Sequence, residues 1–330
     1  MKQLDRRCFT FGAAAATAGA AISTSRAVAQ AGYPNRPITI INAFPPGGIN
    51  DLVTRPFAPA LSAVVNQAVV IETKAGAAGQ VGAQVGAAAP PDGYTLLSHN
   101  IGINSYEEVD KLYARQVKTT RADFIPLARL VADPVMIVVN DQQPWKTMAE
   151  FIADAKAKPT SIIYSSGGLY GASHLPVPLI EKAAGLPKLR HLPTNGGGPA
   201  ITALLGNNAQ MSTQTITATL PHIRAGKLRA LATYGGARSK VLPDVPTLKE
   251  LGYNIEYYLW AGIFAPKATP PNIVAYLNDA IGKAANSDQY KSTLSNAGLD
   301  LAYLPSAAFA KFWDEDAKVT DEAVRMIGKV

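Results

Sequence analysis

The sequence predicts an α/β protein of two lobes, each a parallel-type sheet flanked by helices. Apolar β-branched segments alternate with amphipathic segments along the chain, which is the pattern of strand–helix–strand units. Several predicted strands run directly into glycine-rich loops that precede predicted helices. The chain has 330 residues, enough to bury a large core and to divide into two lobes.

The first 29 residues are expected to be a signal peptide that is removed from the mature protein. Residues 9–22 are small and apolar, and Ala27-Val28-Ala29 has the form of a cleavage site. The pair Arg6-Arg7, followed by Phe9, is typical of a twin-arginine signal, and a chance arginine pair in an ordinary secretory signal is the alternative. We therefore expect a periplasmic protein whose signal is cleaved near Ala29.

Composition argues against several classes of function. The single cysteine, Cys8, lies in the predicted signal, so the mature chain has no disulfide, thiol nucleophile or thiolate metal site. The net charge of +7 includes four positive and one negative side chains in the first 29 residues, which leaves +4 for the remainder. No lysine or arginine run suits nucleic acid, the four histidines lack metal-pair spacing, and common hydrolase and nucleotide motifs are missing. We expect no nucleic-acid partner, no metal, no cofactor and no catalysis.

The first lobe is expected to start with a strand over residues 38–44 that ends in Pro45-Pro46-Gly47-Gly48. Asn50 or Asp51 is predicted to cap the helix that follows, and Pro56 is predicted to kink or restart it. The free N–H groups at such a helix start suit an anion, and a plain strand–helix connection is the alternative.

The rest of the sequence repeats this order of strand, loop and helix. Further strands over 68–72 and 94–98, with a helix over 79–89, predict a parallel sheet whose ligand lies beyond the carboxyl ends of the strands. Later strands are predicted over 135–139, 161–165, 189–192, 209–213, 228–233 and 257–265, and later helices over 147–158, 220–226, 272–285 and 307–326, with another near Pro176 and Pro178. The chain is expected to cross between lobes near Ala132 and Thr233, so lobe 1 holds residues 30–131 and 233–330, and lobe 2 holds residues 132–232.

Motifs along the whole mature chain resemble the Bug family, the periplasmic solute-binding proteins of tripartite tricarboxylate transporters. The motifs are Tyr33-Pro34 with Arg36-Pro37-Ile38, Phe44-Pro45-Pro46-Gly47-Gly48 with Asp51, Pro91-Asp92-Gly93-Tyr94, Leu220-Pro221-His222-Ile223 with Ala225-Gly226-Lys227, Leu242-Pro243-Asp244-Val245-Pro246-Thr247, and Ala265-Pro266 with Thr269-Pro270. The resemblance implies a type II periplasmic binding protein (Venus flytrap) fold, no catalysis, and capture of a carboxylate for a two-component membrane permease. A monomer is expected. A twin-arginine-exported enzyme or cofactor-binding protein, and a ligand sensor for a signalling system, are the alternatives.

The resemblance also implies a ligand site in the cleft between the lobes. The predicted ligand-binding residues are Phe44, Gly47, Gly48, Asn50, Asp51, Asn100, Ser166, Tyr170, Ala172, Ser173, Thr194, Asn195 and Gln214. The chain departs from the family pattern where a lysine is replaced by Asn195, and where an aspartate associated with amino-acid ligands is replaced by Gln214. Apart from Asp51, the cleft would then lack a charged partner for an ammonium group, and an unpaired charge there is costly. We therefore expect an aliphatic or aromatic dicarboxylate as the ligand.

Overall fold

The structure is a computed structural model that describes residues 32–158 and 161–330. The chain divides into two units, Met1–Asn35 and Arg36–Val330, and all the elements below lie in the second unit. The predicted signal peptide, with its arginine pair and cleavage site, lies outside the described residues. Within the described part of the chain, no helix has the length and apolar character needed to cross a membrane.

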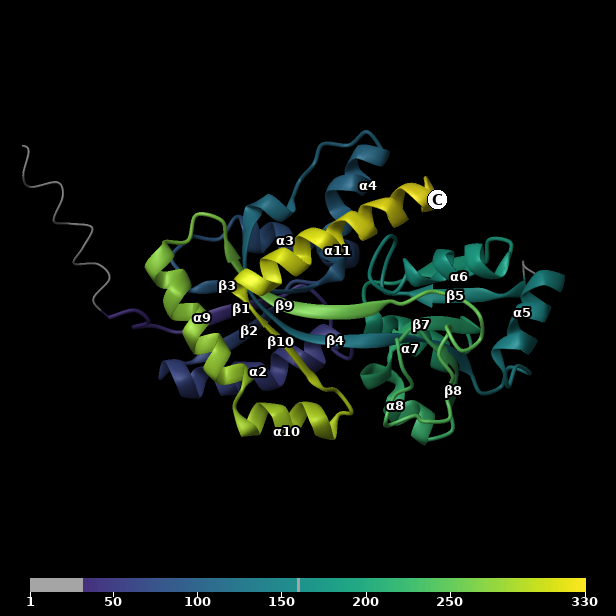
Figure 1. The fold of residues 1–330 in the computed structure, drawn as a ribbon. Coiled ribbons are helices and arrows are strands. Elements are labelled where there is room, and N and C mark those ends of the chain that lie inside the picture. The colour runs from purple at the N-terminus through teal and green to yellow at the C-terminus, as the bar shows by residue number, and fades with distance from the viewer. Residues whose placement is uncertain (1–31, 159–160) are drawn as a thin grey trace, which may run out of the picture. The chain divides into compact units, whose positions relative to one another are not determined.

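Two groups of strands form the sheet of the second unit (Figure 1). In the first group, β1 pairs in parallel with β2 and β3, as predicted, whereas β9 is antiparallel to β3, and β4 is antiparallel to both β9 and β10. These strands are β1 (Ile38–Asn42), β2 (Val69–Thr73), β3 (Thr95–Asn100), β4 (Phe124–Asn140), β9 (Tyr258–Pro266) and β10 (Leu301–Pro305). Their helices are α2 (Ile49–Val65), α3 (Gln80–Ala87), α4 (Tyr106–Leu112), α9 (Pro271–Ala285), α10 (Asp288–Asn296) and α11 (Ser306–Ile327), with short 3₁₀ turns at Ala77–Gly79, Ile101–Ser105 and Arg121–Asp123.

The second group of strands has the same mixture of parallel and antiparallel pairing. β5 is parallel to β6 and β7, and β4 pairs antiparallel with β7 and β8. These strands are β5 (Ile163–Ser166), β6 (Arg190–Pro193), β7 (Met211–Thr215) and β8 (Leu228–Thr233). Their helices are α5 (Met148–Ala157), α6 (Pro176–Ala184), α7 (Gly197–Leu205) and α8 (Ile216–Arg224).

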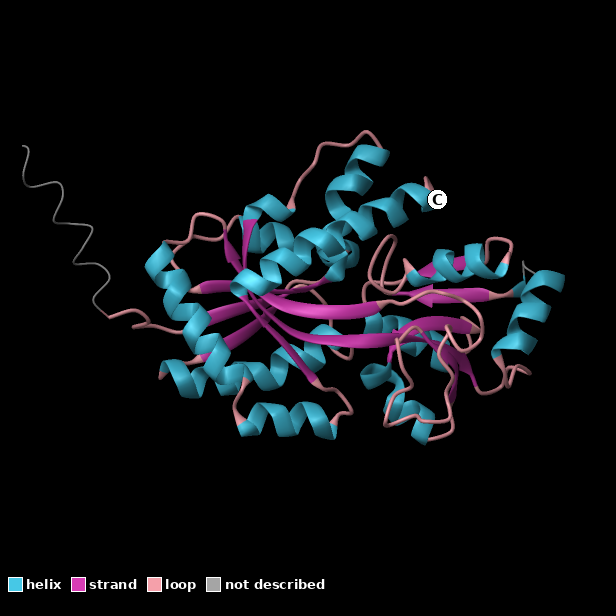
Figure 2. Cartoon of the chain, viewed as in Figure 1, coloured by secondary structure: helices cyan, strands magenta, loops and turns pink. Residues whose placement is uncertain are grey.

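Strand β4 belongs to both groups. Its residues up to Pro134 pair with β9, and its residues from Val135 pair with β7 and β8. Figure 2 shows this strand running without a break from one group of strands to the other. The sequence predicted only residues 135–139 of it, because Pro126 and Pro134 are typical of chain breaks. Proline is tolerated here because the pairing with β9 shifts register after Pro126, as at a bulge.

Helix α2 corrects two predictions. It continues through Pro56 and Pro59 without a restart, with Val53, Phe57 and Leu61 fully buried on one face. Burial of that face offsets the hydrogen bonds that the prolines remove. The N-cap is Gly48 rather than Asn50 or Asp51.

One other helix start also differs from the prediction. Helix α8 begins at Ile216, four residues earlier than expected, because Thr215 caps it by accepting a hydrogen bond from the Ala218 N–H group at 3.4 Å. Helix α6 begins at Pro176, near the predicted position, after a turn that includes Ser173. The cap of α5 by Thr147, in contrast, is confirmed, and Glu150 completes its capping box.

A buried carboxylate lies where β4 passes from one group to the other. Asp133 is 2% exposed, and its carboxylate accepts a hydrogen bond from the Thr217 N–H group at 3.1 Å, in the first turn of α8. Burial outweighs this hydrogen bond and raises the pKa of Asp133 to about 7.

The raised pKa predicts that stability falls as pH rises through the acidic range. Between the ordinary value of 3.8 and about 7, the folded protein holds a proton on Asp133 that the unfolded chain has released. The free energy of unfolding contributed by this residue therefore decreases across that window. Thermal melts at about pH 5 and about pH 8 should show a smaller decrease in Tm for Asp133→Asn than for the unmodified protein. Asp244→Asn, at an exposed loop position, is the control, and an equal decrease in all three proteins would contradict the prediction.

Candidate functional site

A small cavity lies where loops of the two strand groups meet. Its volume is about 30 Å³. It is lined by Phe44, Gly48, Ile49, Asn50, Asn100, Gly167, Gly171, Ala172, Ser173, Gly197, Gln214, Thr215 and Leu259. Seven of these are predicted ligand-binding residues: Phe44, Gly48, Asn50, Asn100, Ala172, Ser173 and Gln214. The carboxyl ends of β1, β3, β5 and β7 all lead to this cavity, the position at which α/β sheets bind ligands.

Three helix N-termini meet at the cavity. Gly48 is the N-cap of α2, Gly197 is the first residue of α7, and Thr215 is the N-cap of α8. The first N–H groups of a helix have no partner within it, and the helix dipole places partial positive charge there. Among the described residues that line the cavity, none is Asp, Glu, Lys, Arg or His. The field in the cavity therefore comes from backbone dipoles, and it favours an anion.

Two asparagine side chains form the wall contributed by the first group. The Asn100 amide nitrogen donates to the Asn50 side-chain oxygen at 2.8 Å, and the Asn50 amide nitrogen donates to Ser98 Oγ at 3.3 Å. The Asn100 side-chain oxygen accepts from the Gly102 N–H group at 2.9 Å. Both amides are at most 5% exposed, so this network fixes their orientation before any ligand arrives.

Ser173 and Gln214 form the polar wall contributed by the second group. Ser173 Oγ accepts from the Gly167 N–H group at 2.8 Å, which leaves the serine hydroxyl hydrogen free to donate. The Gln214 amide nitrogen donates to Ser212 Oγ at 3.0 Å. The two side chains are thus held in place by neighbours on their own group of strands.

The other predicted residues lie outside this cavity. They are Gly47, Asp51, Ser166, Tyr170, Thr194 and Asn195. Asp51 binds Arg55 at 2.5 Å, one turn along α2, and its carboxylate also accepts from the Gly47 N–H group at 3.3 Å. Both partners are local, and neither Asp51 nor Gly47 lines the cavity.

The remaining predicted residues lie elsewhere in the second group of strands; they are Ser166, Tyr170, Thr194 and Asn195. Ser166 Oγ lies 2.7 Å from His191 Nε2. Tyr170, Thr194 and Asn195 line a separate hollow of about 530 Å³, where the Tyr170 hydroxyl donates to the Gly328 carbonyl at 2.7 Å. Sequence spacing could not predict the position of the Tyr170 side chain. Tyr170 adopts a left-handed backbone conformation, with φ of 54°, and its side chain lies against the C-terminal residues.

The buried histidines near these loops do not supply positive charge. His174 and His191 stack with ring centroids 4.3 Å apart. Burial lowers the pKa of His174 to about 3 and that of His191 to about 4, and it lowers the pKa of His99 to about 4. All three imidazoles are therefore neutral at physiological pH. Among the described residues, no cluster of three histidine, aspartate or glutamate side chains is arranged to hold a metal ion.

Six lining residues were not predicted. They are Ile49, Gly167, Gly171, Gly197, Thr215 and Leu259. Gly167 and Gly197 lie in the glycine loops that the sequence singled out, so their places were recognisable. Thr215 was missed because the prediction began α8 at Leu220, although a threonine at the end of an apolar strand is a common helix cap.

Two strand groups that share a strand, with an anion-favouring cavity between their loops, define a solute-binding protein of the two-lobed type. The model of the tripartite tricarboxylate transporter family receptor matches residues 53–329, and the chain belongs to this family. A protein from the gbd 5′ region of Cupriavidus necator is 35% identical to this chain over 318 residues, covering 96% of this chain and 95% of the relative.

Solved structures of similar proteins confirm the predicted fold class and the resemblance to the Bug family. The periplasmic binding protein BugD aligns with a TM-score of 0.81 and 28% identity, over 88% of this chain and 97% of BugD. MatC from Rhodopseudomonas palustris with bound malate gives 0.81 and 26%, over 88% and 99% of the two chains. A second R. palustris protein, with adipate, gives 0.84 and 25%, over 90% and 99%.

The loops that close over the cavity touch backbone to backbone. A Cβ atom at Gly196 would lie 2.6 Å from Pro45 Cδ, and one at Gly198 would collide with the carbonyl oxygen of Pro46. Gly48 and Gly197 also face one another, but a Cβ atom at either would meet the other glycine at an ordinary 3.5 to 3.6 Å. The contact between the two groups of strands thus depends on the absence of side chains at Gly196 and Gly198.

Gly198→Ala is expected to keep the two loops apart. The new methyl group has no room against Pro46, and the Gly198 backbone is not in a left-handed conformation that would itself exclude alanine. Small-angle scattering should give a larger radius of gyration for the variant than for the unmodified protein. Gly206→Ala, whose Cβ would meet its nearest atoms at an ordinary 3.4 Å, is the matched control. Identical scattering from Gly198→Ala and Gly206→Ala would refute the contact.

Proposed function

We propose that this protein binds a dicarboxylate in the cavity between its two groups of strands and delivers it to a two-component membrane permease. The observation that carries the proposal is the meeting of three helix N-termini at a cavity without charged side chains. The start of α2 serves one carboxylate, and the start of α7, with Ser173, serves the other, because Asp133 and Thr215 already accept from the Thr217 and Ala218 N–H groups of α8. Membership of a transporter receptor family supports delivery to a permease from the periplasm.

The chemistry of the walls favours a diacid over an amino acid. An ammonium group would enter a site of positive helix ends with no lining carboxylate to balance it. Asp51 cannot take that role, because Arg55 and the Gly47 N–H group already occupy its oxygens. The malate and adipate held by the two R. palustris proteins are both dicarboxylates, which supports the same class here.

Ligand entry requires the two groups of strands to separate from the arrangement in this structure. The cavity volume of about 30 Å³ is far smaller than the roughly 300–1,000 Å³ of typical ligand pockets. Contacts at Gly48, Gly197 and Gly198 involve backbone rather than interlocked side chains, so little packing is lost when the loops part. A diacid that bridges the helix starts then replaces this direct contact in the closed, liganded form.

Calorimetric titration should identify the ligand class. Succinate, malate, adipate and phthalate form the test set, and aspartate and glutamate are the controls that add an ammonium group. We expect at least one diacid to bind more tightly than either amino acid by about tenfold or more, because a buried unpaired charge costs well over 1.4 kcal/mol. Tight binding of aspartate or glutamate, with no response to any diacid, would exclude the proposal.

The diacid that binds most tightly in this titration should bind Ser173→Ala more weakly than the unmodified protein by roughly tenfold or more. A hydrogen bond to a charged group contributes about 1.5–3 kcal/mol. Thermal melts of the same variant report separately on the Gly167 hydrogen bond. Ser161→Ala, at an exposed serine of the same group of strands, is the control. A lower Tm for Ser173→Ala with unchanged affinity would assign Ser173 to the local fold alone.

A further inference from the structure

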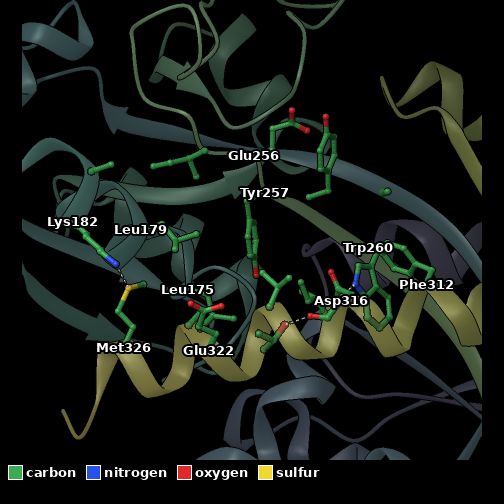
Figure 3. A pocket seen from close by; sticks show the side chains of 18 of the residues that line it. Leu175, Leu179, Lys182, Glu256, Tyr257, Trp260, Phe312, Asp316, Glu322 and Met326 are labelled. Carbon is green, nitrogen blue, oxygen red and sulfur yellow. Dashed lines mark hydrogen bonds between the residues drawn. The ribbon is translucent and has the colours of Figure 1, made fainter.

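A second and much larger cavity lies on the opposite face of β9 from the proposed dicarboxylate site. Its volume is about 810 Å³ (Figure 3). Side chains alternate between the two faces of a strand, so Leu259 lines the small cavity, whereas Tyr258 and Trp260 line the large one. The two cavities therefore do not share these side chains, and the large one needs an explanation of its own.

The walls of the large cavity are mostly apolar and come from both strand groups. One wall carries Leu175, the N-cap of α6, and Leu179, within α6. Figure 3 shows them across from α11, which carries Phe312 and Met326. Trp260 adds an indole ring from β9. A volume of this size and an apolar, aromatic lining with a few polar groups are typical of small-molecule sites.

Two polar groups inside this cavity have unused hydrogen-bonding capacity. Asp316 Oδ2 accepts from Trp260 Nε1 and from the Asn104 amide nitrogen, both at 2.8 Å, and among the described residues no hydrogen bond reaches Oδ1. The hydroxyl of Tyr257 is buried and has no partner within the described part of the chain. Burial raises the pKa of Asp316 to about 6, which leaves its carboxylate ionised at neutral pH and in need of a donor.

The charges around the cavity do not favour an anion. Lys182 and Arg129 line it, and so do the acids Glu256, Asp316 and Glu322. The Arg129 guanidinium stacks on Phe312 at 4.5 Å and donates through Nε to the Ala302 carbonyl at 3.0 Å. Glu256 is paired with Lys249, and the remaining acids and bases balance, so the lining has no net positive charge to hold a carboxylate of the kind proposed for the small cavity.

We propose that the large cavity is a second ligand site, for a neutral aromatic molecule with a hydroxyl or amino group. The donor group binds Oδ1 of Asp316, and the ring packs between Phe312 on one side and Leu179 on the other.

The test uses 2-naphthol as the probe and its methyl ether, which lacks the donor, as the matched compound. Ligand-observed NMR and calorimetry on the full mature protein, without dicarboxylate, should show that 2-naphthol binds and that the ether binds at least about tenfold more weakly. Absence of 2-naphthol binding, or equal binding of both compounds, would overturn the proposal. Neither result depends on the small cavity, so this test stands apart from the test of dicarboxylate binding.

Two tryptophan substitutions locate the probe. Ala183 is an exposed residue of α6 that lines the cavity of about 810 Å³, so Ala183→Trp should narrow it and weaken 2-naphthol binding. Ala308 is an exposed residue of α11 that does not line it, so Ala308→Trp should leave binding unchanged. Asp316→Asn keeps an oxygen for Trp260 but removes the charge, and it should weaken 2-naphthol by about tenfold while leaving the ether unaffected. Unchanged binding to Ala183→Trp would overturn the proposal even if Asp316→Asn failed to fold.

Discussion

The continuous pairing of β4 is the constraint on which the site depends. One strand hydrogen-bonds with β9 over its first part and with β7 and β8 over its second, so the two groups of strands share a backbone ladder. That shared ladder brings the carboxyl ends of β1 and β3 close to those of β5 and β7. The glycine loops that follow these ends can then meet, and their helix starts surround one cavity.

Local chemistry explains which parts of the fold were predictable. The strand over 228–233 agrees with β8 at both ends, and the Thr147 cap was recognisable, because each depends on a few adjacent residues. The first part of β4 could not be predicted, because Pro126, Asp133 and Pro134 are unfavourable in a strand and the distant partner strands were not known. Helix α2 shows the same limit, because packing of Phe57 and Leu61 overrides the local effect of two prolines.

The site was predictable to the extent that strand ends and glycine loops determine it. Asn50, Asn100 and Gln214 follow or begin such loops, and the structure brings their side chains to one cavity. Tyr170 lies away from this cavity, and its left-handed backbone conformation is not evident from the sequence. The pairing of Asp51 with Arg55 could have been predicted, because an aspartate and an arginine four residues apart are neighbours on a helix.

The source of the field at the site has a consequence for how the protein binds anions. A lysine or arginine would bring a mobile charge that attracts any anion and that must be desolvated when the site closes. In the proposed dicarboxylate site, helix starts instead present fixed N–H groups whose directions are set by α2 and α7, so selectivity would come from the geometry of two carboxylates rather than from charge alone. The neutral His174 and His191 reinforce this arrangement, because they pack behind the loop without adding charge. A ligand with one carboxylate satisfies the helix starts on one side only, and it leaves the N–H groups on the other side without the partner that would hold the loops together.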